Sequence, residues 1–398
     1  MIEVVGIGAA GWESLGPSER RLVQDADLVL GGLRHLDLLP AIIGQQRIRL
    51  PVDLRRSLAA LTADHERRRI VVLGSGDPLV YGIGSTLIEI FGVDSVAIHP
   101  AVSSVALAAA RMGWAADSYD VVRVHGRELD EVSRHLSPGR RLVILSRDGS
   151  TPDLVRQFVT ETGFGRSKIT VLAQLGSSAE CRWDQIWPPD PPDLNVVCVT
   201  CEPSRPSAAW SAASGLADEV FDHDGQLTKR NVRASAIAHL MPVPGQLLWD
   251  VGAGAGSIGI EWMRTHRRCS AIAIERDLAR VKRIRVNAAR LGVPDLQVVE
   301  GEAPGACRGL PPPDAVFLGG GADRETVGRC WAALRPGGRL VGHAVTQQTE
   351  AILVEFWRRL GGDLTRISIE SMQPIGNYHG WQPARPVVQW AVQKPLDA

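Results

Sequence analysis

The sequence predicts an α/β protein with two domains, and three observations support this prediction. First, apolar runs of strand length alternate with helical patterns along most of the 398 residues. Second, the alternation stops at residues 204–216, where prolines, serines and other small residues without periodicity indicate a linker. Third, the glycine-rich turns on the two sides differ in spacing, which indicates a fusion of unlike domains, 1–203 and 217–398, rather than a duplication.

In the first half, apolar runs and helical patterns follow one another in regular succession. We predict strands at residues 2–7, 26–30, 70–74, 95–99, 120–124, 141–146, 169–173 and 194–200. We predict helices at residues 17–25, 54–64, 83–91, 103–112, 129–136 and 152–160. This alternation is typical of an α/β domain.

The same alternation begins again after the linker. We predict strands at residues 247–251, 270–275, 296–300, 314–318, 338–345, 363–371 and 387–393. We predict helices at residues 228–240, 257–265, 277–291, 323–334 and 347–360. No helix separates the last two strands, so we expect the second sheet to end in an antiparallel, hairpin-like edge.

The most informative motif is a glycine-rich turn in the second half. The apolar strand 247–251 runs into Gly252-Ala253-Gly254-Ala255-Gly256, and a helical pattern begins directly after it. Glycines allow the backbone to come close to a ligand at the N-terminus of that helix. Glu275 ends the next strand, where a carboxylate suits the two hydroxyls of a ribose. The sequence therefore predicts a nucleoside-binding site at this edge of the sheet.

The G-x-G-x-G spacing is shorter than the dinucleotide fingerprint and resembles that of Rossmann-type S-adenosylmethionine-dependent methyltransferases. A third strand end leads into Gly301-Glu302-Ala303, and in such enzymes this turn lies against the adenine. The resemblance implies a Rossmann-like methyltransferase domain whose three turns hold the cofactor. A dehydrogenase and a non-catalytic Rossmann domain are the alternatives.

The start of the chain carries a different glycine pattern. Gly6, Gly8 and Gly11 match a dinucleotide fingerprint when taken alone. However, Pro17 marks a helix start several residues after the last glycine, and no acidic strand end follows at the required distance. We therefore do not expect a nicotinamide dinucleotide at this site.

Further along the first half, two turns carry the residue types of a second ligand site. Gly74, Gly76 and Asp77 form the turn after strand 70–74, and Ser104 stands at the start of helix 103–112. With the VGIG start and a Gly-Gly-x-Arg-His segment, these stretches resemble the tetrapyrrole methylase family. The resemblance implies a fold of two α/β lobes, about 1–112 and 113–203, with these four residues lining a cleft for S-adenosylmethionine.

The order of the two domains is itself informative. Together with the segment from Phe221 to Arg230, it resembles the family of precorrin-6Y C(5,15)-methyltransferases (decarboxylating) of cobalamin biosynthesis. The resemblance implies one S-adenosylmethionine per domain, with Thr228 as a further contact in the second half. It assigns methylation of carbon 5 to the first half, and methylation of carbon 15 with loss of the ring-C acetate carboxyl to the second. The resemblance further implies that the substrate is the tetrapyrrole precorrin-6B and that the product is precorrin-8X. It also implies that the enzyme is a homo-oligomer.

Composition limits the other partners. The net formal charge is zero, which argues against a dedicated nucleic-acid binder. No apolar run is long enough to cross a membrane, and six cysteines without framework spacing indicate the cytoplasm. Cys198 and Cys201 form a lone CxxC pair without a second pair of ligands, so we expect no metal site.

The sequence assigns no catalytic residue. Methyl transfer to an electron-rich ring carbon requires alignment and exclusion of water rather than a strong base. Loss of carbon dioxide makes a general acid plausible, and His343 and Tyr378 are candidates by location only. For each of them, an ordinary hydrogen-bonded loop residue is the alternative.

Arginine and lysine side chains crowd residues 264–290. We expect most of them to be solvated, with one or two left to bind substrate carboxylates. The same cluster leaves open an RNA or other small-molecule methyltransferase in which one half is a non-catalytic interaction domain.

Overall fold

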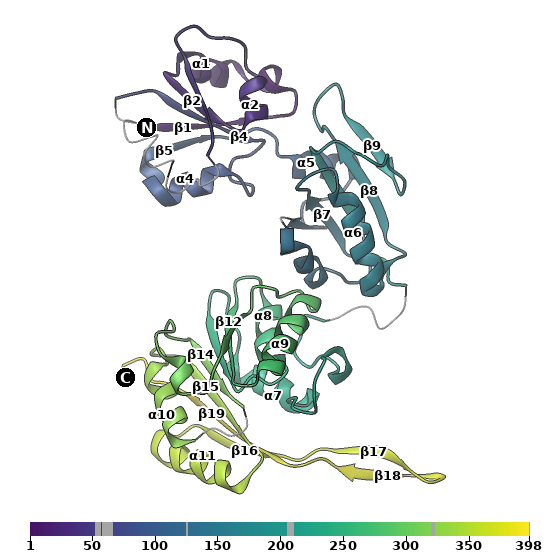
Figure 1. The fold of residues 1–398 in the computed structure, drawn as a ribbon, viewed down its shortest axis with the longest axis vertical. Coiled ribbons are helices and arrows are strands. Elements are labelled where there is room, and N and C mark those ends of the chain that lie inside the picture. Colours follow the sequence, from purple (N-terminus) through teal and green to yellow (C-terminus); the bar gives the residue numbers. More distant parts are fainter. Residues whose placement is uncertain (52–56, 58–66, 125, 205–210, 320–322, 398) are drawn as a thin grey trace. The chain divides into compact units, whose positions relative to one another are not determined.

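The computed structural model describes residues 1–51, 57, 67–124, 126–204, 211–319 and 323–397. Two compact units make up the chain: Met1–Leu129 with Ser137–Ala208, and Asp130–Leu136 with Ala209–Ala398 (Figure 1). The short segment Asp130–Leu136 thus packs within the second unit, although its neighbours in sequence belong to the first. The helix predicted at 54–64 lies, apart from residue 57, outside the described residues, as does part of the linker.

The first unit begins with a five-stranded parallel sheet in the order β3-β2-β4-β1-β5. Its strands are β1 (Ile2–Ile7), β2 (Leu28–Gly31), β3 (Gln46–Arg49), β4 (Ile70–Ser75) and β5 (Val96–His99). The helices around it are η1 (Gly11–Ser14), α1 (Pro17–Asp25), α2 (Leu33–Asp37), α4 (Ile83–Phe91) and η2 (Val93–Ser95). Alternate residues of β1 belong to different apolar clusters, Ile2 and Val4 to one and Val5 and Ile7 to the other. The sheet is therefore buried on both faces.

A second, mixed sheet completes the first unit, in the order β6-β7-β10-β8-β9. Its strands are β6 (Asp120–Arg123), β7 (Arg141–Leu145), β8 (Lys168–Ala173), β9 (Cys181–Asp184) and β10 (Asn195–Thr200). The helical segments of this part are α5 (Ser104–Met112), α6 (Thr151–Val159) and the π turn η4 (Thr160–Phe164). The 3-10 segment η3 (Gly126–Arg134) begins in this unit, and its residues from Asp130 onward belong to the second. Two α/β lobes are thus confirmed.

The second unit contains a seven-stranded sheet in the order β13-β12-β11-β14-β15-β19-β16. Its strands are β11 (Leu247–Val251), β12 (Ser270–Glu275), β13 (Gln297–Glu300), β14 (Ala315–Leu318), β15 (Arg339–Ala344), β16 (Asp363–Ile367) and β19 (Val387–Gln393). The first five are parallel, whereas β19 pairs antiparallel with both β15 and β16. The predicted antiparallel edge is confirmed.

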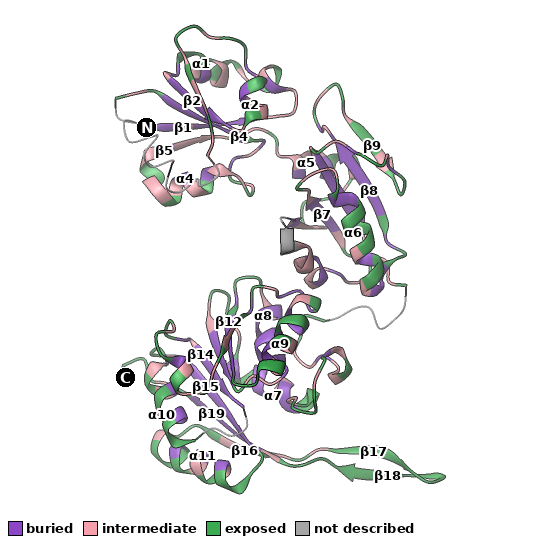
Figure 2. Ribbon diagram, viewed as in Figure 1, coloured by how far each residue is buried: buried purple, intermediate pink, exposed green. Residues whose placement is uncertain are grey.

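Helices cover this sheet on both faces, and its strands form the buried centre of the unit (Figure 2). The helical segments are η6 (Asp218–Val220), α7 (Arg230–Leu240), α8 (Ser257–Thr265), α9 (Leu278–Arg290), η7 (Gly305–Cys307), α10 (Arg324–Ala333) and α11 (Gln347–Leu360). Register places Val251 beside Ile274 and Leu318, and Glu275 beside Glu300. The carboxyl ends of four parallel strands therefore meet at one edge, as a Rossmann-like nucleoside site requires.

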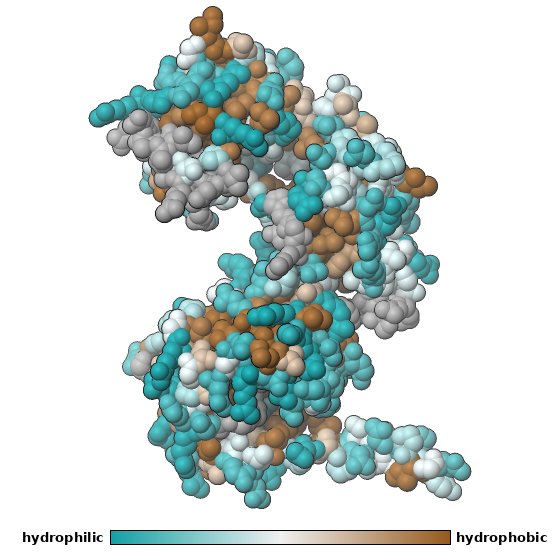
Figure 3. Space-filling model, viewed as in Figure 1, coloured by the Kyte–Doolittle hydropathy of each residue, from teal (hydrophilic) through white to brown (hydrophobic). Residues whose placement is uncertain are grey.

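A separate two-stranded ribbon extends from the second unit. The strand predicted at 363–371 ends at Ile367, and a new strand, β17 (Glu370–Ile375), pairs with β18 (Tyr378–Pro383). Both strands are exposed, and polar and apolar side chains are mixed along them (Figures 2 and 3). Sequence periodicity could not separate this ribbon from the sheet because it has no buried face.

Other differences concern α2 (Leu33–Asp37) and β18, which were not predicted, two edge strands and one helical segment. The prediction missed β3 and β9, which lie at sheet edges and carry mostly polar, partly exposed residues. The helix predicted at 129–136 is the 3-10 segment η3 instead. No helix in the described part of the chain is long and apolar enough to cross a membrane.

Candidate functional site

A cavity of about 1070 Å³ opens at the carboxyl ends of the parallel strands of the second unit. Seven of its lining residues belong to the three turns predicted from sequence: Gly252, Ala253, Gly254, Glu275, Gly301, Glu302 and Ala303. Thr228 also lines the cavity, from the loop that precedes α7. The fold thus brings together residues that are up to 75 positions apart in the sequence, as the order of the strands predicts.

The glycine turn after β11 has a backbone that only glycine adopts readily. Gly252, Gly254 and Gly256 have φ angles of +71°, +61° and +77°. A Cβ on Gly254 would lie 3.0 Å from the carbonyl oxygen of Gln226, and one on Gly256 would lie 2.9 Å from Ile284 Cγ2. Gly254 therefore allows the turn to approach the Gln226 backbone closely, whereas Gly256 allows the turn to pack against α9.

Ala255 and Gly256 do not line the cavity. Both are buried, and the Ala255 carbonyl accepts a hydrogen bond of 3.0 Å from Asn287 Nδ2 on α9. Sequence spacing could not distinguish the two sides of the turn. These two residues support the turn on the side away from the cavity, while their neighbours, residues 252–254, line it.

Glu275 holds the turn in place and retains acceptor sites for further hydrogen bonds. Its Oε2 accepts the Gly254 N–H at 2.8 Å, and its Oε1 accepts the Asp277 N–H at 3.0 Å. A carboxylate offers about four acceptor sites, so about two remain. The side chain lines the cavity, where these sites could accept two ribose hydroxyls.

The loop before α7 is fixed by a buried ion network. Arg233 is fully buried, and its Nε donates to Glu261 Oε1 at 2.6 Å and its Nη1 to Asp218 Oδ1 at 3.0 Å. It also donates to the carbonyl oxygens of Leu216 and Thr228. The position of Thr228 at the cavity therefore depends on a cation that is shielded from water.

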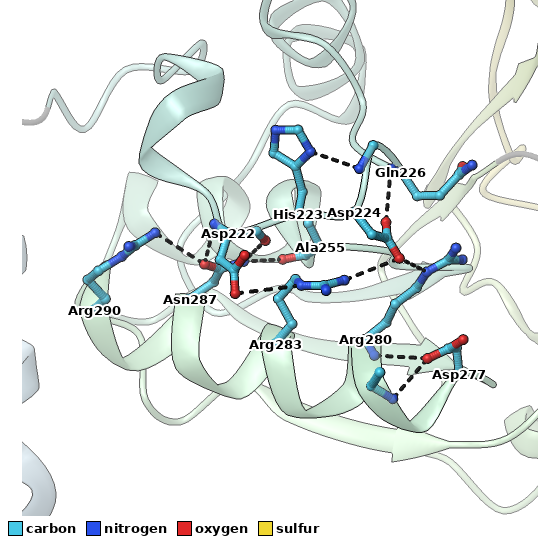
Figure 4. A network of polar contacts seen from close by, with 12 residues as sticks. Asp222, His223, Asp224, Gln226, Ala255, Asp277, Arg280, Arg283, Asn287 and Arg290 are labelled. Atoms are coloured by element: carbon cyan, nitrogen blue, oxygen red, sulfur yellow. Dashed lines mark hydrogen bonds and ion pairs between the residues drawn. The ribbon is translucent and has the colours of Figure 1, made fainter.

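A second set of contacts fastens the same loop to α9, where side chains of both elements point toward one another (Figure 4). Asp224 Oδ2 accepts from Arg280 Nε at 2.9 Å and from Arg283 Nη1 at 3.2 Å. The hydrogen bond from Arg280 is the main reason that the pKa of Asp224 lies well below its usual range. Asn287 donates to and accepts from the backbone of Asp222.

These contacts change the interpretation of the basic segment 264–290. Its arginines are largely engaged within the protein: Arg264 and Arg290 with backbone carbonyls, Arg276 with Glu302, and Arg280 and Arg283 with the loop. Sequence could not reveal these partners, because they lie far away along the chain. Five of the eight arginines of this segment therefore have partners among the described residues of the protein.

The two candidate acids have very different environments. His343 lines the cavity, is only 5% exposed, and its Nε2 lies 3.0 Å from Gln389 Oε1. Burial lowers its pKa to about 4, so the imidazole is neutral near neutral pH. Tyr378 is 79% exposed at the start of β18 and is not among the residues that line the cavity.

Asp250 is a buried carboxyl that sequence reasoning did not single out. Its Oδ2 accepts the Gly259 N–H at 2.9 Å, while its Oδ1 is buried without a hydrogen-bond partner in the described structure. Burial raises its pKa to about 7. The signal was available, since a lone acid in an otherwise apolar strand next to a glycine turn is unusual.

In the first unit, the turns after β1, β4 and β5 meet. Gly76 has φ +55°, its N–H donates to Ile7 O at 3.0 Å, and its carbonyl accepts from Ala101 N at 3.2 Å. A Cβ on Gly6 would lie 2.0 Å from the Gly76 carbonyl oxygen. The glycine at position 6 thus allows β1 and the turn after β4 to approach closely, which gives this member of the apparent dinucleotide motif a structural reason.

The predicted residues of the first unit lie at or beside this meeting point. Gly74 is buried, with Pro78 and Ile83 against it, and Asp77 Oδ1 accepts the Leu79 N–H at 2.9 Å. Ser104 is the first residue of α5, but the residue that caps the helix is Ser103. The Ser103 Oγ accepts the Ala106 N–H at 3.1 Å.

The two units together define the class of protein. Residues 1–183 match the family of tetrapyrrole (corrin/porphyrin) methylases, and residues 219–394 match the precorrin methyltransferase domain family. The chain is therefore a fusion of two methyltransferase domains.

Full-length similarity identifies the particular family. The chain is 43% identical over 403 aligned residues, 99% of its length, to a Sinorhizobium protein named precorrin-6Y C(5,15)-methyltransferase [decarboxylating], of which it covers 96%. It is also 41% identical over 402 residues, 99% of its length, to a Mycobacterium tuberculosis protein of the same name, of which it covers 100%. The chain belongs to the precorrin-6Y C(5,15)-methyltransferase (decarboxylating) family.

A shorter relative matches part of the chain. A Salmonella typhimurium protein named cobalt-precorrin-6B C(15)-methyltransferase (decarboxylating) is 33% identical over 186 residues, 45% of this chain and 96% of that protein.

Proposed function

We propose that this protein is a bifunctional S-adenosylmethionine-dependent C-methyltransferase of cobalamin biosynthesis. It methylates carbons 5 and 15 of precorrin-6B and decarboxylates the ring-C acetate to give precorrin-8X. The first unit acts at carbon 5, and the second acts at carbon 15 and releases carbon dioxide. Full-length similarity to relatives that carry this name supports the proposal.

The observation that carries the proposal is the cavity of the second unit. An open glycine turn, the spare acceptor sites of Glu275 and the turn 301–303 surround one space of about 1070 Å³. This combination fits a nucleoside with a ribose, and we assign it to S-adenosylmethionine, with Thr228 as a further contact and residues 252–256 as the turn beneath it. In the first unit, Gly74, Gly76, Asp77 and Ser104 form the corresponding site.

The chemistry requires little of the side chains beyond alignment. S-adenosylmethionine supplies the methyl group when bound, and the enclosed turns position the reacting groups and exclude water. In the decarboxylation, the bond to the carboxyl carbon breaks, carbon dioxide leaves, and the remaining carbon takes up a proton. His343 is neutral near pH 7, so it can orient a substrate group by hydrogen bonding but does not hold the extra proton of an imidazolium.

The partners follow from the same proposal. The protein acts in the cytoplasm on a soluble tetrapyrrole, as a homo-oligomer, without nucleic acid, a membrane or a metal cofactor. Sedimentation of the purified chain tests the oligomeric state, and a gel shift with RNA at low salt tests the nucleic-acid alternative.

The decisive test counts both cofactor sites and products. Equilibrium dialysis of the purified chain should give two S-adenosylmethionine molecules per chain. Mass spectrometry after incubation of precorrin-6B with methyl-labelled cofactor should give a product with two labelled methyl groups and one carboxyl group fewer. An unchanged mass would refute the proposed substrate.

A further inference from the structure

Three polar side chains meet at the carboxyl ends of β2 and β4 in the first unit. Arg34 Nη2 lies 2.8 Å from His35 Nε2 and 3.1 Å from Ser75 Oγ, and the same Nε2 lies 2.8 Å from Ser75 Oγ. Ser75 is the last residue of β4 and stands between Gly74 and Gly76, which we assign to the cofactor site. The cluster therefore borders the proposed reaction site of this unit.

The hydrogen bonds determine where His35 carries its proton. A guanidinium can only donate, so His35 Nε2 must be the acceptor. The Ser75 hydroxyl accepts from Arg34 and can donate to the same nitrogen, whose single lone pair Arg34 and Ser75 then share. Burial, together with the charge of Arg34, lowers the pKa of His35 to about 4, and the neutral ring then holds its proton at Nδ1.

Within the described chain, Arg34 has neutral acceptors but no carboxylate partner, and one nitrogen of His35 has no acceptor. His35 Nδ1 is buried and has no hydrogen-bond partner among the described residues. No carboxylate of the described chain forms an ion pair with Arg34, and burial lowers the pKa of its guanidinium without a compensating acid. A half-buried cation without a counter-charge and a buried N–H donor without an acceptor are costly unless a ligand supplies an anionic acceptor.

We infer that Arg34, His35 and Ser75 form a carboxylate-binding site. The ligand is an anion with planar oxygen acceptors, which suits the fork of a guanidinium. This inference rests on the proposed function, which offers two sources of such a carboxylate. One source is the acetate and propionate side chains of the tetrapyrrole, and the other is the methionine part of S-adenosylmethionine.

The test uses the full chain with Arg34→Gln, Arg34→Lys and the milder Ser75→Ala. Arg21→Gln, an exposed arginine on α1, is the matched control. Binding of S-adenosylmethionine is measured by calorimetry, and kcat and KM are measured with precorrin-6B. Loss of a hydrogen bond to a charged group weakens binding by roughly tenfold to a hundredfold, and Lys should restore part of it.

Two results support the site and identify its ligand. A raised KM for precorrin-6B with unchanged cofactor binding assigns a substrate carboxylate. Weaker binding of one of the two cofactor molecules, with the other unchanged, assigns the cofactor carboxylate. In both cases carbon dioxide release by the second unit should persist with Ser75→Ala.

Two other results overturn it, and they differ from each other. If all Arg34 and Ser75 variants are folded and match Arg21→Gln in both measurements, the cluster is only structural and the inference fails alone. If the wild-type chain transfers no methyl group to precorrin-6B, the proposed function fails and takes the inference with it.

Discussion

Replacement of Glu261 by alanine should destabilise the second unit more than any surface change. One carboxylate accepts three donors: Arg233 Nε at 2.6 Å, Gly215 N at 2.7 Å and Leu216 N at 3.0 Å. The guanidinium of Arg233 is fully buried, so loss of Glu261 leaves a shielded cation whose one remaining ion pair among the described residues is with Asp218. Removing one partner of a buried ion pair costs about 3–5 kcal/mol.

The expected shift is large enough to measure by thermal unfolding. For a domain of this size, about 1 kcal/mol corresponds to roughly 2–4 °C in Tm, so Glu261→Ala should lower the transition of the second unit by about 6–20 °C. Binding of S-adenosylmethionine to this unit should weaken as well, because Arg233 also holds the carbonyl of Thr228.

Glu355→Ala is the matched control for this prediction. Glu355 pairs with Arg324 at 2.7 Å on the surface, where such a pair contributes about 1 kcal/mol or less. Differential scanning fluorimetry of both variants, each with and without cofactor, compares the two directly. Equal Tm values for Glu261→Ala and Glu355→Ala would refute the reasoning about the buried network.

Two further predictions concern the cavity. Gly254→Ala should weaken cofactor binding at least tenfold in calorimetry, because a Cβ there meets the Gln226 carbonyl. Gly309 has a similar positive φ, but a Cβ there would meet no atom within 4 Å, so Gly309→Ala should leave cofactor binding unchanged. His343→Gln should flatten the pH dependence of stability: the folded pKa of about 4 lies below the unfolded value of about 6.5, so the wild-type protein loses up to about 3 kcal/mol as pH falls through this range. Urea unfolding at several pH values gives the free energy of unfolding of the wild-type protein and of His343→Gln. Asp250 contributes equally to both proteins, so its opposite pH dependence cancels in the difference between them. Equal pH profiles for the two proteins would contradict the prediction.

The sequence predicted those parts of the protein that depend on local patterns. The turn at 252–256, the acid at 275 and the turn at 301–303 each follow an apolar strand, and parallel strand order brings their ends together without further information. The same logic placed Gly74, Gly76 and Asp77 at the carboxyl end of one strand, which is β4 in the structure. Helix starts at Pro17 and at Ser257 were also visible, because proline and glycine punctuate the pattern.

The remaining features depend on partners that are distant in sequence. The contacts of Arg280 and Arg283 with Asp224 span more than fifty residues, so their segment looked like a solvated basic surface. The ribbon β17–β18 has no buried face and hence no hydrophobic alternation. The depressed pKa of His343 arises from burial among strands and helices whose packing no periodicity specifies.

If the two units carry separate activities, variants of single residues should lose these activities separately, and analysis of the products distinguishes them. Glu275→Ala alters the second unit, and Gly76→Ala alters the first, where a Cβ would lie 3.0 Å from Ser103 Cα. With precorrin-6B and methyl-labelled S-adenosylmethionine, Gly76→Ala should give one labelled methyl group and retain loss of carbon dioxide. Glu275→Ala should abolish that loss. Release of carbon dioxide that survives Glu275→Ala but disappears with Gly76→Ala would contradict the account.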